Sequence, residues 1–261
     1  MPALRDEAII LARLPLRERD LLVVLLTRQQ GVQRAVARRA RGGRGRLAAV
    51  LEPLNTCRVS LFRRGQAELA GLDEAALVRS AFTLARRPAA WAAGQVVAEL
   101  ATLFCPEGQR SDASFRLVDH CLEYLLGWGD PRIAVAYAEL WFLRLAGVLP
   151  DLTRCAGCQQ PLGGGPWGWE AASGHLLCSS HAAGAGQLLP AAATAWLTRA
   201  SRVAVGDVRQ PPPSAAMSWL RLLREAFTER PLRSWEFLQQ VLAAYPGAGA
   251  PAGAPTPGDE S

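Results

Sequence analysis

Short apolar segments separated by turn residues fill the first quarter of the chain. We expect strands at residues 7–14, 20–27, 32–40, 48–52, 56–62 and 67–72. The unbroken apolar run within residues 20–27 is typical of a strand that is buried on both faces. Gln29-Gln30-Gly31 predicts a turn after that run. Five or six short strands at close spacing predict a small β-barrel.

The pattern changes after Asp73, where apolar residues recur at helical spacing. Ser111 is expected to cap one helix. The pair Asp130-Pro131 predicts the start of another helix, because the carboxylate can cap it and proline fits its first turn. Gly147 is expected to end that second helix. The other stretches with helical character are residues 88–104, 191–200, 214–227 and 234–245.

These patterns predict an α+β protein with two domains. Residues 1–78 form the barrel, and residues 79–245 form an α-helical domain that contains a small inserted segment at 153–182. Residues 246–261 consist mainly of glycine, alanine and proline, so we expect a disordered tail there.

Composition favours a cytoplasmic globular protein. The chain has 261 residues, half of them hydrophobic, which is enough for a sizeable core. It lacks an apolar run long enough to cross a membrane, and the charged residues 5–7 do not resemble a signal peptide. Of the six cysteines, Cys57, Cys105 and Cys121 are expected to be buried as small apolar residues. Such a set does not resemble a disulfide framework, which favours a reducing compartment.

The positive charge is concentrated at the N-terminus. The formal net charge is +6, but residues 1–71 hold 14 arginines and 6 acidic residues, a net charge of +8. Residues 72–261 hold 15 arginines and 17 acidic residues, a net charge of −2. Excess charge confined to one domain is expected of a protein that binds a polyanion there.

An arginine-rich segment without acidic residues follows the third predicted strand. Its members are Arg34, Arg38, Arg39, Arg41, Arg44 and Arg46. The segment could simply be a solvated loop that aids solubility. However, small barrels bind nucleic acids through loops and one sheet face, and arginine binds phosphate with two parallel hydrogen bonds. We therefore predict that these residues bind a nucleic-acid backbone without reading its sequence.

A second motif has the spacing of a zinc site. Cys155-x-x-Cys158 is followed, after nineteen residues, by Cys178-x-x-His181. Buried thiols or a redox motif are the alternatives, but the glycine-rich flanks favour turns over a packed core. His175 is the competing fourth ligand, and we rank His181 first because it completes a second pair of the same span. Four protein ligands leave no open position, so we expect one structural Zn²⁺.

Both motifs resemble a known family. In the first domain the matching residues are Glu18-x-Asp20, the apolar strand to Thr27, Gly31, Ala37-Arg38-Arg39-Ala40-Arg41 and Leu51-x-Pro53. In the second they are Gly147-Val148-Leu149-Pro150-Asp151-Leu152, the Cys155/Cys158 pair and Gly174. From about residue 5 to about residue 245 the chain resembles RecO, the bacterial recombination mediator. The family usually has Lys-Gly where Arg38-Arg39 stand, and a cysteine where His181 stands.

The resemblance implies an N-terminal OB-fold barrel, followed by an α-helical C-terminal domain with an inserted zinc-binding knuckle. It also implies binding of single- and double-stranded DNA, annealing of complementary strands and a place in the RecF pathway. The implied protein partners are RecR and the C-terminal tail of the single-strand-binding protein. RecA is an indirect partner, loaded onto coated DNA, and the implied location is the cytoplasm, in association with the nucleoid.

Three functional hypotheses follow from these features. The favoured one is a non-enzymatic DNA-binding mediator. A zinc hydrolase or nuclease would need an open coordination position and a general base, and the sequence has no H-E-x-x-H, carboxylate cluster or P-loop. A protein-interaction scaffold, with the basic loop facing an acidic protein, is the third. A weak response to DNA would favour the scaffold.

Overall fold

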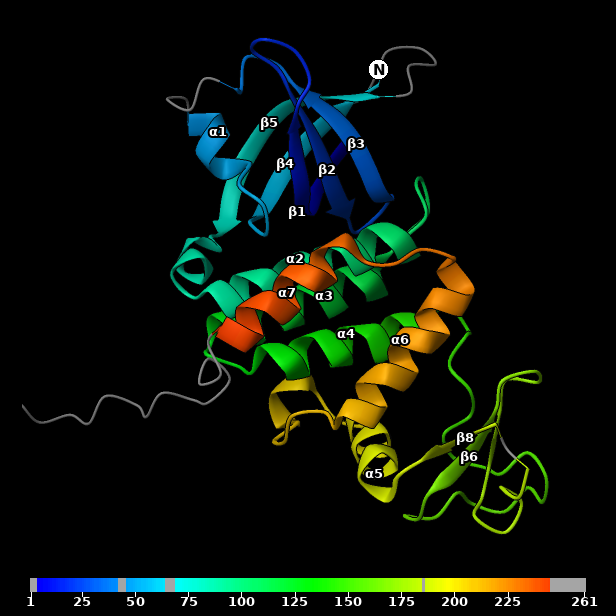
Figure 1. The fold of residues 1–261 in the computed structure, drawn as a ribbon. Coiled ribbons are helices and arrows are strands. Elements are labelled where there is room, and N and C mark those ends of the chain that lie inside the picture. Colours follow the sequence, from blue (N-terminus) through cyan, green and yellow to red (C-terminus); the bar gives the residue numbers. More distant parts are fainter. Residues whose placement is uncertain (1–3, 42–45, 64–68, 185, 245–261) are drawn as a thin grey trace, which may run out of the picture.

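The N-terminal part of the computed structural model is a closed barrel of five strands (Figure 1). The structure describes residues 4–41, 46–63, 69–184 and 186–244. The strands are β1 (Leu4–Pro15), β2 (Leu21–Thr27), β3 (Gly31–Ala37), β4 (Thr56–Phe62) and β5 (Ala70–Arg79). Their order is β1-β2-β3-β5-β4, closed by pairing of β1 with β4; only β3 and β5 are parallel. This arrangement confirms the predicted OB-fold barrel.

Strand β2 is buried on both faces, as its apolar run predicted. Val23 and Leu25 point into the barrel core. Val24 and Leu26 point the other way, into the core shared with the helices. Side chains alternate across a strand, so one segment serves two cores. The barrel is thereby joined to the helical part through apolar contact.

Two barrel predictions are corrected. Residues 48–52, expected as a strand, lie largely in the helix α1 (Arg46–Val50). Leu47, Val50 and Leu51 pack into the barrel core at helical spacing, and so short an apolar run fits either period. Strand β5 (Ala70–Arg79) runs past the expected end at 72, because β4 pairs with it as far as Arg79. Residues 67 and 68 lie outside the described part of the chain.

The second part consists of helices, with two short 3₁₀ helices between them. Figure 1 shows α2 and α3 between the barrel and α4, with α5 on the far side of α4. The 3₁₀ helices are η1 (Phe82–Arg86) and η2 (Val205–Asp207). The α-helices are α2 (Pro88–Phe104), α3 (Asp112–Leu126), α4 (Pro131–Leu145), α5 (Ala191–Ala200), α6 (Ser214–Thr228) and α7 (Arg233–Ala244). The predicted tail, 246–261, lies outside the described residues.

The ends of α3 and α4 test the capping predictions. Asp130 caps α4, where its carboxylate accepts from the backbone N–H of Arg132 at 2.8 Å. Gly147 follows the last turn of α4 with a φ of 71°, a left-handed conformation that suits glycine. Ser111 precedes α3, but its hydroxyl donates to the carbonyl of Gln109 at 3.1 Å and caps no helical N–H. Ser111 therefore occupies the predicted N-cap position of α3, but the predicted hydrogen bond from its side chain to the helix is absent.

A buried ion pair joins α4 to α6. Nε of Arg224 lies 2.7 Å from Oε1 of Glu139, and their side chains are 1% and 3% exposed. Arg224 also donates to the carbonyl of Arg230 at 3.2 Å. Burial raises the pKa of Glu139 to about 7, although the adjacent guanidinium opposes that rise. The pair therefore places an ionisable group in the helical core.

A small three-stranded sheet follows α4. Its order is β7-β6-β8, with β6 (Trp167–Glu170), β7 (His175–Leu177) and β8 (Gln187–Leu189). Trp169 meets Trp219 of α6 edge-on at a centroid distance of 6.3 Å, which attaches the sheet to the helices. Among the helices of the described chain, none is both long and apolar enough to cross a membrane.

Candidate nucleic-acid interface and metal centre

The turn after β3 is fastened to the turn between β1 and β2. The backbone N–H of Arg39 donates to Oδ1 of Asp20 at 2.9 Å. The backbone N–H of Arg41 donates to the carbonyl of Arg19 at 3.0 Å. The Arg41 guanidinium donates to the carbonyl of Arg17, also at 3.0 Å. These bonds bring two arginine-rich turns side by side.

The structure places most of the predicted DNA-binding arginines on this surface. The exposed side chains among them are those of Arg34, on β3, and of Arg38, Arg39 and Arg41, in the turn that follows. Arg44 lies outside the described residues, and Arg46 is the first residue of α1. Arg39 has a φ of 56°, a conformation that its bond to Asp20 helps to hold.

Sequence reasoning missed two members of the surface. Arg17 and Arg19 are exposed in the turn between β1 and β2, and they border the turn after β3 through the bonds of Arg41. Glu18 separates them in the sequence and hid them from a search for acid-free segments. The two arginines within residues 17–19 were the sequence signal that could have identified them. We call Arg17, Arg19, Arg34, Arg38, Arg39 and Arg41 the arginine surface.

The guanidinium groups of the arginine surface are available for a ligand. Within the described residues, no carboxylate oxygen lies within 4.0 Å of any of them. Other barrel arginines are committed to carboxylates: Arg13 to Glu52 at 2.7 Å, and Arg28 to Glu7 at 2.9 Å. An unpaired, exposed guanidinium can bind a phosphate without first breaking an ion pair.

The four predicted metal ligands converge. The Sγ atoms of Cys155, Cys158 and Cys178 and a ring nitrogen of His181 all lie within 4.8 Å of one another. Cys158 Sγ is 3.9 Å from Cys178 Sγ, and Cys155 Sγ is 4.0 Å from His181 Nδ1. Tetrahedral Zn²⁺ with Zn–S bonds of about 2.3 Å separates its sulfur ligands by about 3.8 Å. The donor set and spacing therefore fit zinc.

Local bonds hold the ligands in place. The backbone N–H of Cys178 donates to Sγ of Cys155 at 3.3 Å. The hydroxyl of Ser180 and the ring of His181 lower the pKa of the Cys178 thiol to about 5. Glycine at position 157 allows the His181 ring to approach closely, because a Cβ there would lie 3.2 Å from that ring, a tight contact. The thiolate is the form that binds metal, so the site favours the ligating state.

His175 does not join this group. It lies on β7, paired with Glu170 of β6, and its side chain is exposed. The clustered ligands lie outside these strands: Cys155 and Cys158 come before β6, and Cys178 comes directly after β7. Four protein ligands leave no position for a reactive water, so the arrangement suits a structural metal ion.

Comparisons with known proteins agree across both parts of the chain. Residues 1–81 match the family model described as "Recombination protein O N terminal", and residues 86–236 match "Recombination protein O C terminal". A protein of Geobacter metallireducens named "DNA repair protein RecO" is 33% identical over 245 residues, 92% of this chain and 99% of the relative.

Two further relatives carry the same name. The one from Anaeromyxobacter sp. (strain K) is 35% identical over 194 residues, 74% of this chain and 76% of its own length. The one from Koribacter versatilis is 39% identical over 159 residues. That match covers 60% of this chain and 64% of the relative, so it spans slightly less than two thirds of that protein.

Proposed function

The chain belongs to the recombination protein O family, and on that premise we propose that it is a non-enzymatic, DNA-binding mediator of recombinational DNA repair. One observation carries this proposal beyond family membership. Two turns of the barrel present five exposed arginines, strand β3 adds Arg34, and within the described residues no carboxylate oxygen lies within 4.0 Å of their guanidinium groups. A surface of this kind suits a polyanion with regularly spaced phosphates.

Binding through such a surface is independent of base sequence. Guanidinium groups contact backbone phosphates, and the release of condensed counterions provides much of the binding free energy. The bases of a single strand stay free to pair. We propose that the protein binds single- and double-stranded DNA and anneals complementary strands, because it reduces the repulsion between two backbones while base pairing selects the partner.

The family premise also supplies the proposed partners. RecR and the C-terminal tail of the single-strand-binding protein are proposed as direct protein partners. Loading of RecA onto coated single strands would follow from these contacts, in the cytoplasm and in association with the nucleoid. One Zn²⁺ is proposed to be held by the three cysteines and His181, where it would supply folding stability to the segment between α4 and α5.

Annealing of two complementary fluorescent oligonucleotides tests this function. The wild-type protein is expected to accelerate pairing over the spontaneous rate and to have no effect on non-complementary strands. A variant with alanine at Arg17, Arg19, Arg39 and Arg41 should lose most of the acceleration. The matched control removes four exposed arginines of the helical part that have no described carboxylate partner: Arg110, Arg202, Arg230 and Arg233.

The control variant loses the same net charge, so it should anneal as fast as the wild type if the arginine surface is responsible. Equal losses in both variants would show that only overall charge matters. No acceleration by the wild type, together with no DNA binding, would contradict the mediator function and favour a scaffold that uses this surface for an acidic protein.

A further inference from the structure

Strand β5 continues beyond the point where the barrel closes. It pairs with β3 only at three positions, ending with Ala37 opposite Leu72. Its pairing with β4 continues to Arg79. From residue 73 to residue 78, β5 therefore has a neighbouring strand on one side only. In the part of the chain that the structure describes, the backbone of these six residues forms no hydrogen bond except those to β4.

This open edge is supported by its pairing with β4 from Glu74 to Leu77, and the register shifts at Asp73 and at Val78. At its end the Arg79 guanidinium donates to the carboxylates of Asp119 and Glu123 on α3, the latter at 2.7 Å. An extended strand with unpaired N–H and C=O groups is a template for an added strand, and the fixed backbone lowers the entropic cost of that addition.

Apolar side chains surround the second half of the edge. Leu77 and Val78 are 47% and 48% exposed, and Phe82 of η1 is 69% exposed. Beside them lies a hollow of about 900 Å³ between the end of α1, β5 and the start of α2. Val50, Pro53, Ala76, Leu77, Phe82 and Trp91 contribute to its apolar lining. Such a hollow can accept a side chain of a strand that pairs with β5.

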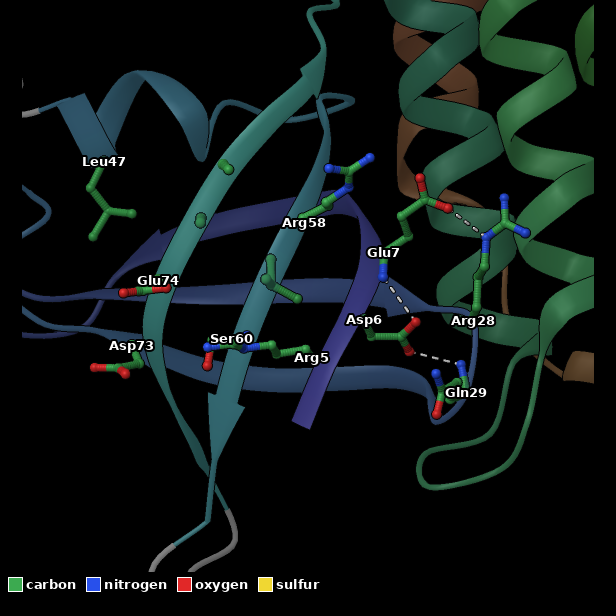
Figure 2. Close-up of a pocket in the computed structure, with 13 residues that line it drawn as sticks. Arg5, Asp6, Glu7, Arg28, Gln29, Leu47, Arg58, Ser60, Asp73 and Glu74 are labelled. Atoms are coloured by element: carbon green, nitrogen blue, oxygen red, sulfur yellow. Dashed lines mark hydrogen bonds and ion pairs between the residues drawn. The ribbon is translucent and has the colours of Figure 1, made fainter. Parts of the chain in front are cut away.

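Two carboxylates mark the first half of the edge. Figure 2 shows Asp73 and Glu74 on the side of β5 away from β4, toward Leu47 of α1. Both are exposed, and no described arginine lies within 4.0 Å of either carboxylate. A ligand along this edge would therefore meet negative charge at residues 73 and 74 and apolar surface at 77 and 78.

We propose that the edge of β5 from residue 73 to residue 78 binds an extended segment of a partner protein as an added strand. The segment has an apolar side chain that fills the hollow and a basic residue that pairs with Asp73 and Glu74. Main-chain hydrogen bonds provide affinity, and these two side-chain preferences provide specificity.

Charge distinguishes this occupant from two others. Nucleic acid would place phosphates against two carboxylates, which repel them. A second copy of the chain, paired antiparallel about Ala76, would set Asp73 opposite Arg79. That guanidinium is already bound to Asp119 and Glu123, so a second copy provides no unpaired basic side chain for Asp73 and Glu74. A partner segment with its own basic residue provides one.

A designed peptide probes the proposal on the full-length protein. In the labelled peptide Thr-Val-Ile-Thr-Val-Arg-Arg, antiparallel pairing sets the apolar half against Leu77 and Val78 and the arginines against Asp73 and Glu74. Two further peptides carry backbone N-methyl groups at alternate residues, one in each phase. Only alternate N–H groups of an added strand face its neighbour. Fluorescence anisotropy should therefore show binding at least tenfold weaker for one methylated peptide and nearly unchanged for the other.

Charge reversal gives the second measurement. Asp73→Lys with Glu74→Lys should weaken binding of the unmodified peptide at least tenfold and leave the melting temperature unchanged. The matched control is Glu229→Lys with Glu236→Lys, two exposed positions with no described ion pair, which should bind as the wild type does. Absence of saturable binding, or equal weakening by both methylation patterns, would overturn the proposal. So would sedimentation showing a dimer that the Asp73/Glu74 variant dissociates, since the occupant would then be a second copy.

Discussion

Replacing Arg224 by methionine should destabilise the helical part in a way that depends on pH. The substitution removes the guanidinium that lies 2.7 Å from Glu139 and leaves that carboxyl group buried without its ion-pair partner. Methionine keeps most of the side-chain volume, so a cavity contributes little. The loss of stability therefore reports on the charge of Glu139.

The magnitude follows from the geometry. Two unit charges 2.7 Å apart attract each other by about 6 kcal/mol at an effective dielectric constant of about 20. Part of that attraction offsets the cost of burying both charges, and removing one partner of a buried pair costs about 3–5 kcal/mol. Protonation of the unpaired carboxyl limits the pH-dependent part of the loss at pH 8 to about 1.4 kcal/mol for a wild-type pKa of about 7, so we expect a total loss near the lower end of this range.

The pH dependence gives the sharper signature. The pKa of Glu139 is raised by burial to about 7 in the folded wild type. An acid whose pKa is raised on folding lowers stability as pH rises from its unfolded pKa to its folded pKa. Above about pH 7, the ionisation of Glu139 should therefore no longer change the free energy of unfolding of the wild type. Without Arg224 the folded pKa lies higher still, and stability should keep falling by up to about 1.4 kcal/mol per pH unit above pH 7.

Urea unfolding followed by circular dichroism at pH 5, 7 and 8.5, with the metal site saturated, measures this difference. A second variant, Glu139→Leu with Arg224→Met, should recover most of the lost stability and show no such slope, because no buried charge remains. A loss for Arg224→Met that is the same at pH 5 and pH 8.5 would refute the reasoning. So would a loss below about 1 kcal/mol at pH 8.5, since it would mean that Glu139 is not left as a buried, unpaired charge.

Three further predictions concern the metal centre and a helix cap. Cys155→Ser with Cys158→Ser should lower the zinc content by atomic absorption and lower the melting temperature, because structural zinc contributes folding free energy; full zinc occupancy would contradict this. His181→Ala should lose more zinc than His175→Ala, and the reverse order would show that the fourth ligand is misassigned. Asp130→Ala should cost about 1 kcal/mol in urea unfolding, whereas an unchanged midpoint would show that the cap is dispensable.

The sequence predicted the barrel well where the pattern was local. The β2 segment is apolar throughout, and it is buried on both faces because it serves two cores. Helix ends with strong local chemistry, such as Asp130-Pro131, were also predictable. Misreadings arose where local pattern was ambiguous. The apolar run around α1 is too short to show a period, and a five-residue helix packs into the barrel there.

Other features depend on contacts between distant residues. The length of β5 is set by its pairing with β4 and by the ion pairs from Arg79 to α3. Neither contact can be predicted from the β5 residues alone. Arg17 and Arg19 join the arginine surface only because the turn after β3 is bonded to their carbonyls. The clustering of Cys155, Cys158, Cys178 and His181 could be predicted, because the spacing of each pair already places two candidate ligands in one turn.

The salt dependence of binding to single-stranded DNA tests the central claim most directly. Each phosphate contact contributes about 0.7 to the log–log slope, so six arginines predict a slope of about −4 and a roughly 300-fold loss of affinity from 50 to 200 mM salt. The Arg17, Arg19, Arg39 and Arg41 alanine variant should have a slope of about −1.4. The matched variant in the helical part should keep the wild-type slope. A flat wild-type response, or equal slopes in all three proteins, would contradict the assignment of DNA binding to the arginine surface.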